Sequence, residues 1–175
     1  MAELMGDPRD PDAHDGAPTA ADDAPALVPE AAPVDTSAAV GGDAAAAREA
    51  AAHYYAKGEA HFERREWAEA LKAYRTAAGA DPKMSVAWYY ISAAEREMNG
   101  RKPCDAEYLP LMHCIRLDPN HARAHCGLGN VQMHVRKDPA KAGESFREAI
   151  RLNPNYVAPH ACYAALLETQ GDFTG

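Results

Sequence analysis

The residues best suited to chemistry in this sequence are histidines and cysteines that lie close together. His121 and His125 are four residues apart, and Cys126 follows directly. Imidazole and thiolate groups at this spacing can bind Zn²⁺. The segment has no glutamate in the HExxH arrangement of zinc proteases, so a catalytic metal site is not indicated. We predict structural roles for both histidines, keep zinc binding as the alternative, and expect neither a metal nor a cofactor.

Nucleotide binding and nucleophilic catalysis find little support elsewhere in the chain. Residues 127–129 read Gly-Leu-Gly, but they lie in an expected helix and not in the strand-to-helix turn of a phosphate-binding loop. The neighbours His113 and Cys114 do not by themselves define a catalytic pair. The four cysteines form no CxxC motif, so we expect buried free thiols. The sequence therefore predicts a protein that is not an enzyme.

Charge and aromatic residues are divided unevenly along the chain. Residues 1–50 contain eleven Asp and Glu against two Arg, and no Phe, Tyr or Trp, whereas residues 51–175 contain sixteen Lys and Arg against fifteen Asp and Glu. A stretch so acidic, with many Ala and Pro, cannot bury enough apolar surface to offset its chain entropy. We predict a disordered acidic Ala/Pro/Asp-rich tail over 1–42, with a docking or regulatory arm as the alternative, and a folded domain over 43–175.

Several classes of partner and location are disfavoured by the same composition. No apolar run approaches the ~18–20 residues of a membrane-spanning helix. The N-terminus has neither the apolar core of a secretory signal nor the Arg- and Ser-rich composition of a transit peptide. The near-neutral charge of 51–175 gives no electrostatic footprint for nucleic acid. We therefore expect a soluble, cytoplasmic protein that binds neither membrane nor nucleic acid.

The elements that position these residues follow a repeat. Asp-Pro or Asn-Pro pairs begin at residues 81, 118 and 153, with spacings of 37 and 35 residues. Each pair follows an amphipathic run of helical period, such as Ala142, Phe146, Ala149 and Ile150. Because proline cannot continue a helix, each pair predicts a helix end.

These residues resemble the tetratricopeptide repeat, a helix–turn–helix unit of 34 residues with the pattern W-x2-L-G-x2-Y, then A-x3-F-x2-A, then P. In the first unit its places are taken by Tyr54, Gly58, Ala70, Tyr74, Ala77 and Pro82. The resemblance implies an all-α, right-handed α-solenoid of about 3.5 units. We expect these units at about 51–84, 85–119, 122–154 and, truncated, 157–175.

Four local features refine this expectation. The alanine-rich stretch 44–52 has high helix propensity and should extend the first helix backwards. The turn Asn99–Asp105 has three extra residues, and Pro110 would break the next helix unless that helix starts late or kinks. Asp138-Pro139 predicts an N-cap followed by proline at the first helical position.

The fourth unit stops after a single helix. Tyr163, Leu166 and Leu167 would then be partly uncovered, because solenoids usually end in a polar capping helix. We expect the chain to be a piece of a longer protein, with completion by a partner as the alternative.

The resemblance also implies where a ligand would bind. Stacked repeats form a concave groove lined by their first helices, with contacts from places 2, 5, 9, 12 and 13 of each repeat. Here those places include Tyr55, Glu59, Tyr89, Arg96, Arg123, Asn130 and His134. We predict a scaffold or adaptor that binds a protein segment or peptide there, with a purely structural role as the alternative for each residue.

Family subtypes leave further alternatives. Repeats that bind the C-terminal Glu-Glu-Val-Asp tails of chaperones use clustered Lys, Arg and Asn side chains. The matching places hold Tyr55, Glu59, Tyr90, Arg123 and Gly127, so a chaperone tail is disfavoured. A recognition arm of a longer enzyme is a second possibility. Glycosyltransferases with similar repeat arrays often have Asn at the sixth place of successive repeats, and this sequence lacks Asn at those places. A structural subunit of a large assembly, docked through the long turn, is a third.

Overall fold

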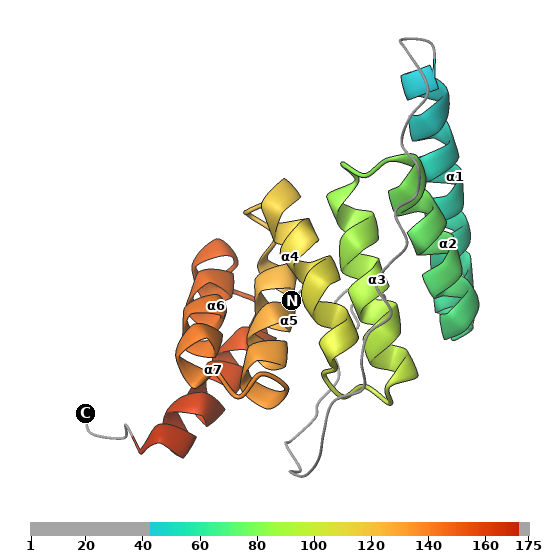
Figure 1. Ribbon diagram of the computed structural model, residues 1–175. Coiled ribbons are helices and arrows are strands. Elements are labelled where there is room, and N and C mark those ends of the chain that lie inside the picture. Colours follow the sequence, from blue (N-terminus) through green and yellow to red (C-terminus); the bar gives the residue numbers. More distant parts are fainter. Residues whose placement is uncertain (1–42, 172–175) are drawn as a thin grey trace, which may run out of the picture. The chain divides into compact units, whose positions relative to one another are not determined.

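The computed structural model describes residues 43–171, apart from the side chains of Asp43 and Gln170; the predicted tail over 1–42 lies outside the described residues. The described chain is helical throughout and contains no strand (Figure 1). Its helices are α1 Asp43–Glu63, α2 Trp67–Ala80, α3 Ser85–Met98, α4 Tyr108–Leu117, α5 Ala122–His134, α6 Pro139–Leu152 and α7 Val157–Gln170, with a short 3-10 helix, η1, at Asp105–Glu107.

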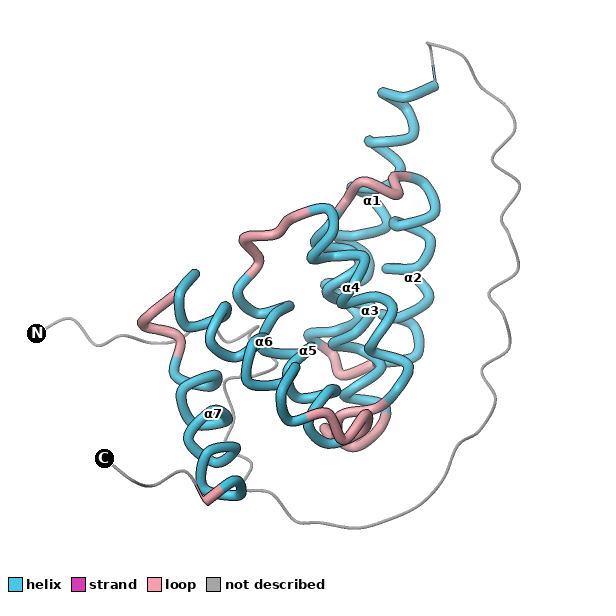
Figure 2. Tube along the Cα trace, turned by 60° about the vertical axis from the view of Figure 1, so that its left-hand side comes forward, coloured by secondary structure: helices cyan, strands magenta, loops and turns pink. Residues whose placement is uncertain are grey.

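Each helix packs mainly against the helices that precede and follow it in the chain, from α1 on α2 to α6 on α7. Loops join the helices, as Figure 2 shows, and the longest of the described loops lies between α3 and α4. This arrangement of helix–turn–helix units that contact their neighbours is that of an α-solenoid. The predicted all-α solenoid is confirmed. The first helices of the units are α1, α3, α5 and α7, and the second helices are α2, α4 and α6.

The helix ends lie where the sequence predicts them. The second helices α2, α4 and α6 end at Ala80, Leu117 and Leu152, each directly before an Asp-Pro or Asn-Pro pair. Asp138 caps α6 by accepting a hydrogen bond from the Lys141 amide at 3.1 Å, and Pro139 is the first helical residue. Helix α1 does extend backwards to Asp43 through the alanine-rich stretch.

The long second turn explains how Pro110 is accommodated. After α3 ends, Gly100 and Arg101 both have φ of 67°, which reverses the chain, and η1 then leads into α4. Helix α4 starts late, so Pro110 is the third residue of its first turn. Amide groups in a first turn have no partner within the helix, and proline there removes no hydrogen bond.

Close approach between first and second helices builds the core. A Cβ added to Gly58 would lie 2.6 Å from the Tyr74 ring, and one added to Gly129 would lie 2.5 Å from the Phe146 ring. Tyr74 and Phe146 are fully buried. The glycines therefore let an aromatic ring of the second helix fill the crossing point with the first helix.

The last described helix is better covered than the sequence suggests. Leu166 on α7 is only 2% exposed, which corrects the expectation that it would be partly uncovered. It packs toward Gly143 of α6, whose missing side chain leaves room for it. Tyr163 and Leu167 are half-buried, as expected.

Candidate partner-binding face

The seven predicted contact residues belong to α1, α3 and α5, and we call this set of residues the first-helix face. Their exposure differs widely. His134 is exposed, whereas Tyr55, Glu59, Arg96, Arg123 and Asn130 are half-buried and Tyr89 is only 3% exposed. Tyr89 can therefore offer a partner little surface. Contact of any of these residues with a partner stays a prediction.

The α1 end of this face is a cluster of aromatic rings. The Tyr55 ring lies 5.6 Å from that of Tyr74 and 5.7 Å from that of Tyr90. Tyr74 and Tyr90 stack at 5.2 Å, and Phe62 meets Tyr90 edge-on at 5.9 Å. Because these rings come from α1, α2 and α3, the cluster fixes the first unit against the second.

Two tyrosine hydroxyls in the cluster are desolvated. Burial, followed by the neighbouring Tyr90 and Glu59, raises the pKa of Tyr55 well above its usual range, and the hydroxyl hydrogen-bonds both neighbours. Burial also raises the pKa of Tyr74 strongly, with Tyr55, Tyr90, Glu59 and Glu63 adding to the effect. The Tyr74 hydroxyl is buried and has no hydrogen-bond partner within residues 43–171.

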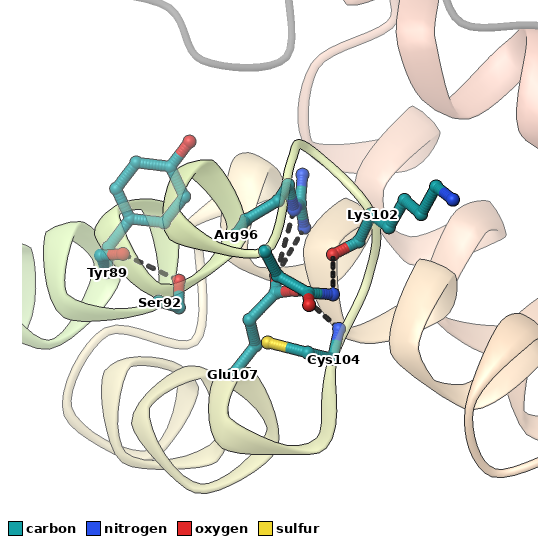
Figure 3. Close-up of polar contacts among 7 residues, drawn as sticks. Tyr89, Ser92, Arg96, Lys102, Cys104 and Glu107 are labelled. Carbon is teal, nitrogen blue, oxygen red and sulfur yellow. Dashed lines mark hydrogen bonds and ion pairs between the residues drawn. The ribbon is translucent and has the colours of Figure 1, made fainter. Parts of the chain in front are cut away.

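The middle of the face contains a buried ion pair. Glu107 is fully buried and its carboxylate accepts hydrogen bonds from the Arg96 Nε and Nη2 groups, each at 2.8 Å (Figure 3). The other carboxylate oxygen of Glu107 accepts from the Cys104 amide at 2.8 Å. Arg96 thus ties the long second turn to α3, and its charge is neutralised within the protein.

Sequence reasoning missed Glu107. The signal that could have found it is the spacing Cys104-x-x-Glu107, which matches a capping box with a cysteine in the N-cap position. The cysteine took the place of the usual serine or threonine, and the extra residues of the turn hid the start of the helix.

The histidines that suggested a zinc site have protein partners. His121 caps α5 by accepting a hydrogen bond from the Ala124 amide at 3.2 Å. Its ring lies 4.8 Å from that of Tyr89, and burial lowers its pKa. In the described part of the chain, no three His, Cys, Asp or Glu side chains gather in a way that could hold a metal ion.

His125 instead belongs to a recurring contact. The Trp88 indole donates to the Pro82 carbonyl at 3.1 Å. At the same place in the next two units, the Nε2 groups of His125 and His160 donate to the carbonyls of Pro119 and Pro154 at 3.0 and 2.9 Å. Histidine therefore substitutes for tryptophan as a ring N–H donor that holds the preceding turn.

The comparisons with known proteins agree with this architecture. The family model described as "Tetratricopeptide repeat" matches residues 37–97. Residues 37–97 thus match the tetratricopeptide-repeat family, and the described chain has the fold of its solved domains. A search of curated proteins finds no match.

Solved tetratricopeptide-repeat structures show the same fold. The first TPR of Spaghetti (RPAP3), bound to the HSP90 peptide SRMEEVD, matches with a TM-score of 0.65 and 16% identity, covering 71% of this chain and 95% of that one. The TPR domain of Arabidopsis OM64 matches with a TM-score of 0.64 and 18% identity over 70% and 98% of the two chains. MamA matches with a TM-score of 0.62 and 18% identity over 69% and 68%. Identities this low show the fold alone.

None of the helices within residues 43–171 combines the length and apolar character that a bilayer crossing requires.

Proposed function

We propose that this protein is a scaffold or adaptor whose first-helix face binds a peptide segment of another protein. The observation that carries the proposal is that the first helices α1 and α5 carry partly exposed polar side chains at the predicted contact places: Glu59 on α1, and Arg123 with Asn130 on α5. Side chains repeated along stacked helices can follow an extended or helical peptide. The similar domain of RPAP3 is itself bound to a peptide, which supports the proposal.

The chemistry of the face argues against a carboxylate-rich chaperone tail as that peptide. Recognition of two carboxylates needs clustered cations and amides. Of the matching places, only Arg123 carries a cation, and Glu59 would repel the ligand. Arg96 does not compensate, because Glu107 already holds its guanidinium. We therefore propose a partner segment of different chemistry from the peptide SRMEEVD.

One observation favours a second role for part of the molecule. Glu107 anchors the long turn Asn99–Asp105 from within, while Asn99, Gly100, Arg101 and Lys102 are exposed. A fixed, exposed loop suits a docking contact in a larger assembly, the structural-subunit alternative. A recognition arm of a longer enzyme would use the first-helix face in the same way as the main proposal.

The test is peptide selection on the full 175-residue chain. A phage-displayed library of random dodecapeptides is selected on the wild type, and the affinities of the selected peptides are measured by fluorescence anisotropy. We expect the double variant Arg123→Ala/Asn130→Ala on α5 to weaken binding about tenfold or more, as loss of interface anchors does. The matched control is Lys72→Ala/Glu144→Ala, two exposed residues on the second helices, which should leave the affinity unchanged. Equal affinities for the two variants would contradict binding at this face.

A further inference from the structure

We propose that three exposed residues of α4, Leu109, Met112 and Arg116, form a docking surface for an acidic amphipathic helix of a partner protein. We call these residues the outer stripe of α4. The inference rests on the docking role proposed for the long turn Asn99–Asp105, because it names the chemistry of the partner that would dock beside this turn. It does not involve the first-helix face.

The outer stripe has apolar residues at places where the neighbouring units are charged. The second helices can be aligned on the large side chain in each that is 0% exposed: Tyr74, Leu111 and Phe146. Two places before it, α2 has Lys72 and α6 has Glu144, whereas α4 has Leu109. One place after it, α2 and α6 have arginine, whereas α4 has Met112. Both places are exposed in all three helices, so the fold itself does not require apolar side chains there.

Exposed hydrophobic residues are concentrated in the second unit. Of the five large hydrophobic residues that are exposed within 43–171, Tyr54 lies on α1 and Val157 on α7. The other three, Met98, Leu109 and Met112, belong to α3 and α4. Leu109 and Met112 are 64% and 42% exposed and lie three residues apart, so they share one face of α4. Burial of this pair against apolar side chains of a partner would be favourable.

The charge beside these two residues is positive. Arg116 lies four residues after Met112 and continues the same face of α4. Its guanidinium lies 2.9 Å from the ring of His113 and forms no ion pair within residues 43–171. Lys102, in the turn before α4, is exposed, points away from Glu107 (Figure 3) and also has no ion pair in this range. Helix α4 itself contains no Asp or Glu.

The carboxylates nearest to α4 in the sequence have partners of their own. Asp105 pairs with Arg136 at 2.8 Å, and Glu107 is fully buried in its ion pair with α3. Asp118 is half-buried and accepts a hydrogen bond from the Asn120 amide at 3.1 Å. The uncompensated charge of the outer stripe is therefore cationic. Complementary charge favours a partner that carries carboxylates beside its apolar residues.

The start of α4 is held firmly, which suits a preformed docking surface. The buried pair of Glu107 with Arg96 fixes the segment before α4 to α3. From the other side, the Arg136 guanidinium lies 4.1 Å from the centre of the Tyr108 ring, next to Leu109 in the sequence. A surface that is already ordered loses less conformational entropy on binding.

Other occupants fit the outer stripe less well. A second copy of this chain would bring cations against cations, because the stripe offers no carboxylate to Arg116. An uncharged apolar helix would cover Leu109 and Met112 but leave the Arg116 guanidinium without a charged partner. An amphipathic helix with apolar residues one turn apart and a carboxylate on the next turn meets all three side chains.

The experiment selects partners by their chemistry. A phage-displayed library of helical peptides about 18 residues long, randomised along one face, is selected on the full chain. We expect enrichment of apolar pairs three or four residues apart together with Asp or Glu. Leu109→Gln/Met112→Gln should weaken a selected peptide about tenfold or more, as loss of interface anchors does. The control Lys72→Gln/Glu144→Gln changes the equivalent exposed places of α2 and α6 and should have no effect.

A second variant tests the charge. Arg116→Gln should weaken the same peptide several-fold and reduce the dependence of its affinity on salt concentration. The control is Arg151→Gln, at the same exposed place in α6, which should change neither. Both glutamine variants of α4 alter exposed side chains and should keep the melting temperature of the wild type. An affinity that is unchanged in Arg116→Gln would overturn the acidic character of the partner.

The outcomes separate the stripe from the roles proposed above. Peptides that lose affinity in Lys102→Gln but not in Leu109→Gln/Met112→Gln would overturn the stripe and leave the docking role of the turn. Peptides insensitive to both would overturn the two together. Peptides that lose affinity only in Arg123→Ala/Asn130→Ala would overturn the stripe and support the first-helix face. A dimer in sedimentation velocity that Leu109→Gln/Met112→Gln abolishes would overturn the proposal in favour of a second copy.

Discussion

The buried carboxylate of Glu107 is the most consequential single residue that the structure reveals. It is fully buried, and two side-chain nitrogens of Arg96 and one backbone amide satisfy it. Taking both charges out of water is costly, so such a pair is not necessarily a large net gain in stability. Its effect is specific, because it fixes the enlarged turn in one position on α3.

Removal of one partner should be far more damaging than the net contribution of the pair suggests. Glu107→Gln leaves Arg96 buried beside a neutral group, and we expect it to lower the free energy of unfolding by about 3–5 kcal/mol. The control is Glu95→Gln, which breaks the pair with the exposed Arg75 and should cost less than about 1 kcal/mol. Urea denaturation followed by circular dichroism measures both. Similar losses of unfolding free energy in the two variants would contradict the assignment of Glu107 and Arg96 as a buried ion pair.

His121 should make the stability of the protein depend on pH. Burial holds its folded-state pKa below the ordinary value of 6.5, so the unfolded chain binds its proton more readily. Stability is then fully present above about pH 6.5 and is lost as the pH falls below it. Protonation of Nδ1 would also remove the acceptor that caps α5.

The variant His121→Asn keeps a capping acceptor without a titratable ring. We expect its melting temperature to fall less than that of the wild type between about pH 7.5 and pH 5. The exposed His53→Asn is the control and should fall as much as the wild type does. If the melting temperature of His121→Asn fell as much as that of the wild type, other groups, such as the partly buried His113, would dominate the pH dependence of stability.

Among the helices, the crossing points of each unit determine the packing. Glycine lies at the crossing in the first and third units, and an aromatic ring of the second helix fills the space. The second unit has Ser92 at this place, and its hydroxyl donates to the Tyr89 carbonyl at 2.6 Å. A small side chain with its hydrogen bond satisfied within the helix thus meets the same steric need as glycine.

The size limit at these crossings can be tested with alanine. Gly129→Ala would place a methyl group against the buried Phe146 ring, and we expect it to lower the free energy of unfolding by about 1–3 kcal/mol. Gly79→Ala, on an open surface of α2, should instead raise it by about 0.5–1 kcal/mol through helix propensity. Thermal unfolding of the two variants compares them directly. Equal stabilities would contradict the close approach of α5 and α6.

In the described part of the molecule, the buried residues form two separate clusters and not one common core. One buried cluster joins α2, α3, α4 and part of α5, and a second joins α5, α6 and α7 around Phe146 and Leu166. Since each unit contacts mainly its neighbours, a local loss of packing should stay local.

Hydrogen exchange can test this locality. In Gly129→Ala we expect amide exchange to accelerate in α6 and α7, while α1 and α2 keep their wild-type protection. Gly58→Ala, which crowds the Tyr74 ring, should show the opposite pattern. Mass spectrometry of peptic fragments resolves the helices. Acceleration along the whole chain in both variants would indicate a single cooperative core instead.

The sequence by itself determined the fold class, the repeats and the ends of the second helices. These depend on local properties: the fixed ring of proline, the 3.6-residue period of apolar side chains and the capping chemistry of Asp138. The same properties placed Tyr55, Glu59 and Arg123 on first helices. The repeat pattern could not say how exposed each residue would be.

Only the tertiary structure decided which predicted contact residues are accessible. Tyr89 is buried, and Arg96 is held by Glu107, which lies eleven residues away beyond an enlarged turn. Likewise, Tyr74 fills its expected place in the repeat, but only packing against α1 and α3 leaves its hydroxyl without a partner in the described chain. Burial and pairing depend on contacts between helices, and the sequence pattern of a single helix does not specify them.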